Sequence, residues 1–342
     1  MNERVRLGIS SCLLGNAVRW NSGHKMDRYL TRTLGQFVDY VPVCPEVEAG
    51  FGVPRESMRL VGDPDNPRLI TFKTKTDKTN QKSAHNPIIY ADVPDMSMIR
   101  VGDTYYMSNT TMHMNPGVPI MKSKDLVNWD IVSYAYDTLG NMDELNLVNG
   151  KNCYGKGTWA SCIRYHNNIY YVSSFSSTTG KTYIFTTRNI EKGNWKRIEF
   201  SPGIHDHTLW FDDDGKIYII WGVRKLMIAE LKDDLSGVKE GTERILIENA
   251  NAPVGANVGL GEGSQLFKVN GKYYLFNIAW PRGGMRTVVI HRADKITGTW
   301  EGKVALQDKG VAQGGLIDTP DGKWFSYLFR DYGSVGRIPY LV

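Results

Sequence analysis

The sequence predicts an all-β fold, a five-bladed β-propeller that follows a small N-terminal α/β segment. Five segments share one pattern: a short apolar strand, a tight polar turn and a second strand with an aromatic pair or its equivalent. If the second aromatic residue serves as a marker, successive markers lie 65, 47, 56 and 51 residues apart. Spacings near fifty residues, with a β-hairpin in every unit, are typical of propeller blades. The second strands read GDTYYM (102–107), NNIYYV (167–172), DGKIYI (214–219), NGKYYL (270–275) and DGKWFS (321–326), so the marker aromatics are Tyr106, Tyr171, Tyr218, Tyr274 and Phe325.

Length and composition fit this fold and exclude several classes of protein. The chain has 342 residues with 35 glycines and 11% aromatic residues, which suits a large, turn-rich β domain with an appendage. The net charge of +5 is mild and its basic residues are scattered, so we expect no nucleic-acid partner. No apolar run approaches the ~20 residues of a membrane span, and the N-terminus does not resemble a secretory signal. Four cysteines without disulfide-framework spacing suit a reducing compartment, so a cytoplasmic protein is expected.

The pattern of the chain changes near residue 80 and predicts two unequal parts. Residues 1–72 contain an apolar strand, a charged segment that suits a helix, and a second apolar strand, which together indicate a small α/β unit. Residues 73–85 form a polar stretch, KTKTDKTNQKSAH, without a core-forming pattern, and we interpret it as a linker. Residues 86–342 have almost no helical periodicity and carry the repeat.

The repeat aligns residues that are far apart in the sequence. Trp159, Asp206, Glu262 and Gln313 each lie twelve residues before a marker aromatic, and Asp95 lies eleven residues before the first one. Blades radiate from a common axis, so equivalent positions on their innermost strands meet at one mouth of the central channel. The sequence therefore predicts a site at this mouth, with acids from blades one, three and four.

Each acid also has a simpler interpretation when it is considered alone. Asp95 equally suits an Asx-turn before a strand, and Asp92 is a competing base. Glu262 lies between two glycines and equally suits a surface loop. The acids at 212–214 precede Gly215 and are most simply solvated turn formers, which leaves Asp206 as the third member of the site.

Two histidines flank Asp206 and raise the question of a metal ion. A strand would place His205 and His207 on the same face. No further histidine or acid pattern completes a set of ligands around them. The sequence therefore predicts no metal ion and no cofactor.

Residues 86–342 resemble glycoside hydrolase family 43 throughout. The resemblance rests on NPIIYADVPDMSMIRVGDTYYM, PGVPIMKSKDLVNW, GIHDHTLWFDDDG, GEGSQLFKVNGKYYLF and VGRIPYLV. It implies a five-bladed enzyme that hydrolyses β-xylosides or α-L-arabinofuranosides with inversion. It further implies that Asp95 is the general base, that Glu262 is the general acid, that Asp206 orients this acid and tunes its pKa, and that Arg337 contacts the bound sugar.

General chemistry leads to the same roles. Inverting hydrolysis needs one carboxylate that activates water and one carboxylic acid that protonates the leaving oxygen, about 6.5–9.5 Å apart. Facing blades of a narrow propeller can provide that separation, whereas adjacent residues on one strand cannot. A third carboxylate near Glu262 would raise the pKa of this acid by like-charge repulsion and keep it protonated near neutral pH.

The resemblance also implies a set of substrate-binding residues. Trp159 matches a tryptophan that stacks on sugar, although packing between blades would also explain it. Met112, His113 and Met114 replace an aromatic-rich stretch that shapes the sugar pocket in many relatives, and Met112 and His113 are expected to contact the substrate. Arg286 stands where many relatives have a channel histidine near a calcium ion or water cluster, so no central ion is expected. Gln313 lies beside Gly314, which takes the place of a second family histidine.

The N-terminal segment resembles the family known as domain of unknown function 523, some of whose members are thiouracil desulfidases. The resemblance rests on SSCLLG, GHKMDRYLT and VCPEVEAGFGVPRESMRLVGDP, and it covers about residues 1–72. It implies an iron–sulfur cluster held by three cysteines, of which Cys12 and Cys44 match two. No cysteine follows until Cys153, so the cluster site is incomplete and small buried thiols are the simpler interpretation.

Two expectations concern the end of the chain and its function. Only five residues follow Arg337, which predicts an incomplete fifth blade with an exposed edge, and a chain truncated at its C-terminal end. The leading functional hypothesis is an exo-glycosidase that acts on xylo- or arabino-oligosaccharides derived from plant polysaccharides. The alternatives are a non-catalytic sugar-binding propeller and a sulfur-handling protein that acts through its N-terminal segment.

Overall fold

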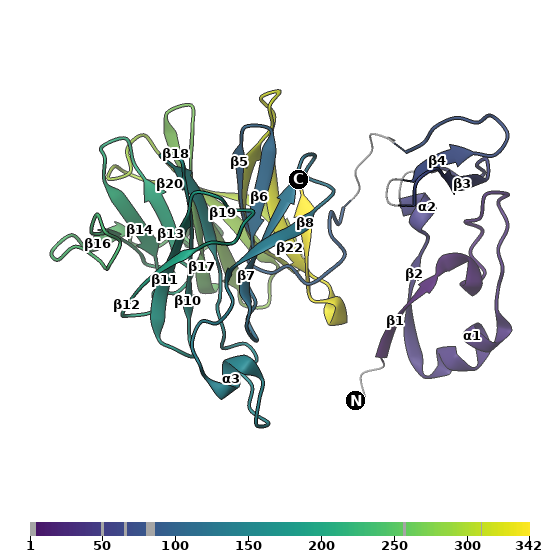
Figure 1. The fold of residues 1–342 in the computed structure, drawn as a ribbon, viewed down its shortest axis with the longest axis horizontal. Coiled ribbons are helices and arrows are strands. Elements are labelled where there is room, and N and C mark those ends of the chain that lie inside the picture. Colours follow the sequence, from purple (N-terminus) through teal and green to yellow (C-terminus); the bar gives the residue numbers. More distant parts are fainter. Residues whose placement is uncertain (1–4, 49–50, 65–66, 80–85, 256–257, 309) are drawn as a thin grey trace. The chain divides into compact units, whose positions relative to one another are not determined.

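The computed structural model describes residues 5–48, 51–64, 67–79, 86–255, 258–308 and 310–342 (Figure 1). The chain forms two compact units, residues 1–85 and residues 86–342. In the described part of the chain, no helix is long and apolar enough to cross a membrane.

The N-terminal unit has the strand, helix and strand order that the sequence predicts. Strand β1 (Val5–Ser10) pairs in parallel with β2 (Val38–Val43), and the short helix α1 (Arg28–Arg32) lies between them in sequence. The carboxylate of Asp27 caps this helix, because its Oδ1 accepts a hydrogen bond from Leu30 N at 2.9 Å. The remaining elements are η1 (Ser11–Leu14), η2 (Leu34–Gln36), α2 (Pro45–Glu48) and the antiparallel pair β3 (Met58–Val61) and β4 (Arg68–Thr71).

The polar stretch that follows β4 differs from the expected linker in its first half. Residues 73–79 fold back on β4, where Lys78 N donates to Leu69 O at 2.8 Å and Thr71 N donates to Thr76 O at 3.0 Å. Asp77 also forms an ion pair with Arg68 at 2.7 Å. Backbone pairing with β4 therefore makes residues 73–79 part of the N-terminal unit, and the rest of the proposed linker lies outside the described residues.

The C-terminal unit is a five-bladed β-propeller, as the sequence predicts (Figure 1). Each blade is an antiparallel sheet, and the first strand of each blade contacts the first strands of both neighbouring blades, which closes a ring. Blade one consists of β5 (Ser97–Val101), β6 (Thr104–Ser108), β7 (Gly117–Ser123) and β8 (Asp130–Tyr136), and blade two of β9 (Cys162–His166), β10 (Ile169–Ser176), β11 (Lys181–Thr187) and β12 (Lys196–Phe200). Blade three consists of β13 (Thr208–Phe211), β14 (Ile217–Trp221), β15 (Leu226–Glu230) and β16 (Arg244–Ile247), and blade four of β17 (Val258–Val269), β18 (Lys272–Pro281), β19 (Arg286–Ala293) and β20 (Glu301–Asp308). Blade five consists of β21 (Val311–Asp318), β22 (Trp324–Asp331) and β23 (Arg337–Leu341).

The marker aromatics explain why the repeat is visible in the sequence. Each of them lies on the second strand of its blade and packs in a different one of five hydrophobic clusters. A large aromatic side chain contributes much of the apolar area that such a cluster buries. One aromatic residue per blade therefore recurs because every blade has to be packed against a neighbour.

The fifth blade has three described strands, and its outer edge is covered rather than exposed. The segment 86–93 runs along β23 and hydrogen-bonds to it. The Asn86 side chain donates to Leu341 O at 2.6 Å and accepts from Leu341 N at 2.8 Å, and Ile88 N donates to Pro339 O at 3.0 Å. The prediction of an exposed edge was wrong, because the start of the propeller satisfies the edge groups of its last strand.

Candidate active site

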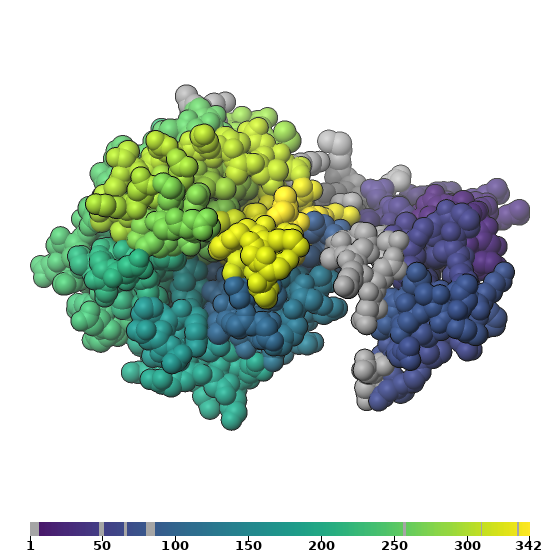
Figure 2. Space-filling model, turned by 90° about the horizontal axis from the view of Figure 1, so that it is seen from above, coloured from purple at the N-terminus to yellow at the C-terminus, as the bar shows by residue number. Residues whose placement is uncertain are grey.

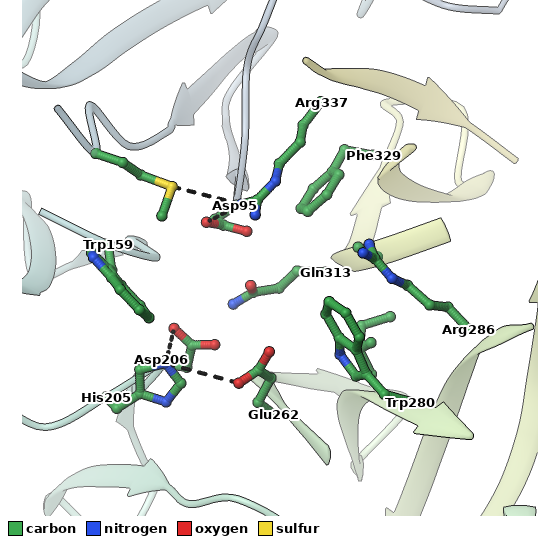
Figure 3. A pocket seen from close by; sticks show the side chains of 13 residues that line it. Asp95, Trp159, His205, Asp206, Glu262, Trp280, Arg286, Gln313, Phe329 and Arg337 are labelled. Carbon is green, nitrogen blue, oxygen red and sulfur yellow. Dashed lines mark hydrogen bonds and ion pairs between the residues drawn. The ribbon is translucent and has the colours of Figure 1, made fainter. Parts of the chain in front are cut away.

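A pocket of about 120 Å³ opens at the mouth of the channel where the innermost strands begin (Figure 3). All five blades contribute to it, as the repeat register predicts. Eight of the nine side chains that we predicted for the site line this pocket, and His113 is the exception. The lining residues are Asp95, Met112, Trp159, His205, Asp206, Glu262, Ile278, Trp280, Arg286, Ala312, Gln313, Phe329 and Arg337.

Asp95 and Asp206 share an unusual backbone conformation. Their φ angles are 51° and 46°, in the left-handed region, and each residue lies two positions before the first strand of its blade. Aspartate tolerates this region better than most residues do, but the conformation still costs energy. Strain of this kind is typical of functional sites, where the surrounding fold holds a side chain in a required direction.

Glu262 reaches the pocket from an irregular point in β17. The pairing of β17 with β18 shifts register between Glu262 and Gln265, and Gly263 between them has a φ of 76°. A bulge of this kind changes the direction in which a neighbouring side chain points. A Cβ atom at Gly263 would lie 2.8 Å from Cγ of Gln313, so the bulge also requires glycine for reasons of space.

Arg337 is the ion-pair partner of Asp95. Its Nη1 donates to Asp95 Oδ2 at 3.2 Å, and its Nε lies 3.8 Å from Asp331 Oδ1. The backbone N–H of Arg337 donates to Asp92 Oδ1 at 2.7 Å. Asp92 does not line the pocket, and its carboxylate holds the start of β23, so the structure favours Asp95 over Asp92 as the acid of blade one.

His205 lies between the other two acids (Figure 3). Its Nε2 is 3.4 Å from Asp206 Oδ1 and 3.9 Å from Glu262 Oε2. Its ring contacts the edges of Trp159 and Phe175, each at a centroid distance of 5.3 Å. Burial lowers the pKa of His205, so a neutral imidazole is expected at neutral pH, and it can donate one hydrogen bond to either acid.

His207 does not share the direction of His205. Its ring is buried, where Nδ1 lies 2.7 Å from Ile204 O and Nε2 lies 2.9 Å from Ser173 Oγ. The expectation that both histidines share a face was wrong, because β13 begins only at Thr208 and the left-handed Asp206 precedes it. The alternation of a regular strand therefore does not apply at these positions.

One group of side chains has the spacing that a metal ion needs. Among the described residues, ligand atoms of His205, Asp206 and Glu262 lie within 4.8 Å of one another. One imidazole and two carboxylates form a donor set of the kind that a divalent cation accepts. The same carboxylates line the pocket, so an ion bound there would occupy the acids to which the family resemblance assigns catalytic roles.

Burial raises the pKa of all three acids. The pKa of Asp95 rises to about 6, because burial outweighs the opposing effect of Arg337, and nearby carboxylates, including Glu262, add to the rise. Burial also raises the pKa of Asp206 well above its usual range, and the charges of Asp95 and Glu262 raise it further. Burial is again the main cause of the raised pKa of Glu262, whereas Arg337 and Arg286 oppose it.

These causes refine the expected role of Asp206. The sequence predicts that repulsion from Asp206 raises the pKa of Glu262, whereas the structure gives desolvation as the main cause for both acids. Both carboxylates lie near the same His205 nitrogen and are coupled, so they take up their protons as a pair.

An aromatic and cationic wall completes the pocket. The Trp159 indole is anchored, because its Nε1 donates to Gly155 O at 3.1 Å. On the other side, the Arg286 guanidinium lies over the Trp280 ring at 3.8 Å and forms an ion pair with Asp331 at 2.6 Å. The stacking on Trp280 accommodates an arginine at the position where the family resemblance implies a channel histidine.

His113 was predicted to line the pocket, and the structure contradicts this. Its Nδ1 accepts a hydrogen bond from Gly155 N at 3.0 Å, and its ring packs against Tyr154 at a centroid distance of 5.0 Å. These contacts hold the ring outside the pocket, and Met112 is the member of the pair that lines it.

Sequence reasoning missed several lining residues that the repeat could have identified. Phe175, Ile278 and Phe329 each follow a marker aromatic by four residues, and the last two line the pocket, whereas Phe175 packs against His205. Trp280 follows its marker by six residues, as Met112 does. Counting forward from each marker aromatic, along the second strand of the blade and beyond it, would therefore have located these residues.

The fold and the pocket define a class of proteins, the five-bladed propellers with an acidic, sugar-sized pocket at one mouth. Comparison with known families identifies the family within this class. The model named Glycosyl hydrolases family 43 matches residues 84–339, and the chain belongs to that family. A second model, named 2-thiouracil desulfurase, matches residues 7–93.

Several characterised proteins are similar to the propeller. A beta-xylosidase of Formosa agariphila is 30% identical over 275 residues, which are 70% of this chain and 45% of that protein. A non-reducing end alpha-L-arabinofuranosidase of Bacteroides ovatus is 26% identical over 262 residues, which are 72% of this chain and 47% of that protein. The chain therefore spans about half the length of the curated relatives that it matches.

Solved structures show the same fold. The bifunctional GH43-CE protein of Bacteroides eggerthii is 71% identical with a TM-score of 0.75, over 77% of this chain and 34% of that one. A GH43 enzyme engineered for both endo-xylanase and exo-arabinofuranosidase activity is 27% identical with a TM-score of 0.63, over 75% of this chain and 51% of that one.

Proposed function

We propose that this protein is an inverting exo-glycosidase that removes terminal xylose or arabinofuranose residues from xylo- or arabino-oligosaccharides. The observation that carries the proposal is the convergence of three acids from three blades on one small pocket, where Asp95 and Asp206 are buried and Glu262 is half-buried. A site that only binds sugar has no need of buried carboxylic acids with raised pKa values, because an unpaired buried charge is costly. Such groups are typical of catalytic sites.

In the proposed mechanism, Asp95 is the general base. Ionised Asp95 takes a proton from the water that attacks the anomeric carbon, while Arg337 holds the carboxylate in place at 3.2 Å. Protonated Glu262 gives its proton to the glycosidic oxygen as the bond breaks. The pKa of Asp95, about 6, sets the lower end of the active range, since this residue must be ionised.

The size and lining of the pocket support exo-action. A space of about 120 Å³ suits one pentose residue rather than an extended chain. Trp159 and Trp280 provide aromatic surfaces for the C–H faces of a sugar, and Arg286, Arg337 and Gln313 provide donors for its hydroxyl groups. The names of similar proteins, beta-xylosidase and alpha-L-arabinofuranosidase, point to the same two pentoses.

A panel of p-nitrophenyl glycosides tests this proposal. We expect release of nitrophenol from the β-D-xylopyranoside or the α-L-arabinofuranoside and little from glucosides and galactosides, because a space of about 120 Å³ suits a pentose and leaves little room for the sixth carbon of a hexose. Inversion is checked by following the anomer that is first released, using NMR. Sugar binding without hydrolysis of any member of the panel would instead support the non-catalytic propeller.

The N-terminal unit carries a separate proposal. We propose that it is a remnant of the domain of unknown function 523 family, as the finer interpretation of its match to the 2-thiouracil desulfurase model. Of its two cysteines, Cys44 is buried, with its thiol 3.4 Å from Glu46 Oε2, and Cys12 is half-buried. A spectrum of anaerobically purified protein without iron–sulfur absorption would exclude the sulfur-handling alternative that depends on such a cluster.

Removal of the N-terminal unit is expected to leave hydrolysis within about twofold of the full chain. A protein that begins at Ser83 keeps Asn86, which pairs with Leu341, and it keeps every residue that lines the pocket. The measurement is kcat/KM on the best aryl glycoside, with circular dichroism as the folding control. A folded but inactive product would mean that the N-terminal unit contributes to the site.

Substitution of Asp206 by asparagine is expected to move the alkaline limb of the kcat–pH profile to lower pH. At pH values at which the raised pKa of Asp206 allows it to ionise, the change removes a negative charge next to Glu262, so the pKa of Glu262 falls and its acid form is lost earlier as the pH rises. The acidic limb, which reports Asp95, should move less. If the alkaline limb stays in place while activity falls at every pH, Asp206 positions the substrate and does not tune the acid.

A further inference from the structure

An exposed tyrosine packs on a half-buried histidine beside the loops that carry Met112 and Trp159, and the proposed chemistry does not explain this pair. The Tyr154 side chain is exposed, at 63%, and its ring is tilted by 43° against the ring of His113. Met114, which follows His113, is also exposed. We call the rings of Tyr154 and His113 the aromatic platform.

Backbone contacts connect the platform to the pocket wall. Gly155 N donates to His113 Nδ1 at 3.0 Å, and Gly155 O accepts from Trp159 Nε1 at 3.1 Å. Gly155 is thus bonded on one side to the platform and on the other to a tryptophan that lines the pocket.

Two further contacts fix the same loops. Gly157 N donates to Met112 O at 2.9 Å, and the thiol of Cys153 donates to His113 O at 2.8 Å. A Cβ atom at Gly157 would lie 3.0 Å from Thr111 O, so the two loops are in close backbone contact. The platform is therefore held in place before any ligand binds, which reduces the entropy lost on binding.

We propose that the aromatic platform is a second sugar-binding subsite, which takes a residue of the oligosaccharide next to the one in the pocket. This inference rests on the proposed function. A sugar ring presents apolar C–H groups on its faces and hydroxyl groups around its rim, so it covers an exposed aromatic ring while its hydroxyls stay in water. Met112, which precedes His113 in the sequence, and Trp159, which is bonded to the same Gly155 as His113, both line the pocket.

The subsite predicts a dependence on chain length. Tyr154→Ala should lower kcat/KM by about three- to tenfold on the trisaccharide, xylotriose or arabinotriose, that the protein hydrolyses. The same change should leave kcat/KM unaltered on the matching glycosyl fluoride, which fills only the pocket and has no second ring. Tyr154→Phe should retain wild-type values on both substrates, because the ring and not the hydroxyl makes the contact.

Tyr165→Ala is the matched control. Tyr165 is another exposed tyrosine of the propeller, at 40%, and its hydroxyl donates to Asn168 Oδ1 at 3.0 Å in the turn at the far end of β9. We expect no effect of chain length in this variant. An equal loss for Tyr154→Ala on the trisaccharide and on the fluoride would overturn the subsite and make Tyr154 a support for Trp159.

A binding measurement keeps the two proposals separate. If the wild-type protein hydrolyses no glycoside, the proposed function fails, but calorimetry with the Glu262→Gln protein still tests the platform. Weaker binding of the trisaccharide after Tyr154→Ala, with unchanged binding of the monosaccharide, supports the subsite. Equal affinities for the trisaccharide with and without the tyrosine ring exclude it.

Discussion

Asp95→Asn is expected to lower kcat by about 10³–10⁴-fold on every substrate, near the upper end of what general acid–base groups contribute. Asparagine has no carboxylate to take the proton from water, so the leaving group makes no difference to the loss. The fold should persist, since asparagine tolerates the φ of 51° at this position and its side-chain oxygen can still accept from Arg337.

Asp92→Asn is the matched control for this prediction. Asp92 is a neighbouring acid whose carboxylate binds the backbone of Arg337 outside the pocket, and an asparagine oxygen can replace that acceptor. We expect its kcat to stay within a few-fold of the wild type. If Asp92→Asn abolishes turnover and Asp95→Asn does not, the base has been assigned to the wrong residue.

Glu262→Gln should reduce kcat by about 10²–10⁴-fold on natural oligosaccharides, and much of the activity should return on an activated aryl glycoside. A natural leaving sugar needs a proton as the bond breaks, whereas 2,4-dinitrophenolate leaves without one. Glutamine keeps the size of the half-buried side chain, so the change removes only the proton source.

The measurement is a plot of log kcat against the pKa of the leaving group. We expect a steep dependence for Glu262→Gln and a shallow one for both the wild type and Asp95→Asn. Equal losses for the two variants with every leaving group would contradict the separate roles of acid and base.

The repeat made most of the site predictable from the sequence. Asp206, Glu262 and Gln313 could be aligned by counting back from a marker aromatic, because the marker is fixed by packing between blades and the inner strand follows from hairpin geometry. The same register, read forward, would have located Trp280 and Phe329. Site residues whose positions follow from the blade repeat can therefore be predicted from the sequence.

Other features of the site and the fold depend on contacts that do not recur from blade to blade, so the repeat does not predict them. His113 is held outside the pocket by Gly155, which lies in a different loop, and nothing near His113 in the sequence indicates that partner. His205 was considered only with His207, whereas a non-strand backbone at Asp206 turns the two rings apart. The covered edge of β23 depends on residues 86–93, at the other end of the propeller sequence.

The pairing of residues 86–93 with β23 places the first and last parts of the propeller sequence against each other next to Asp95, the proposed catalytic base. Asp95 comes from the first blade, and Arg337, which holds it, comes from the last. During synthesis on the ribosome, the first blades emerge long before Arg337 exists to pair with that carboxylate. The site is therefore completed only when the last strand joins the ring, and hydrolytic activity would report that folding has finished.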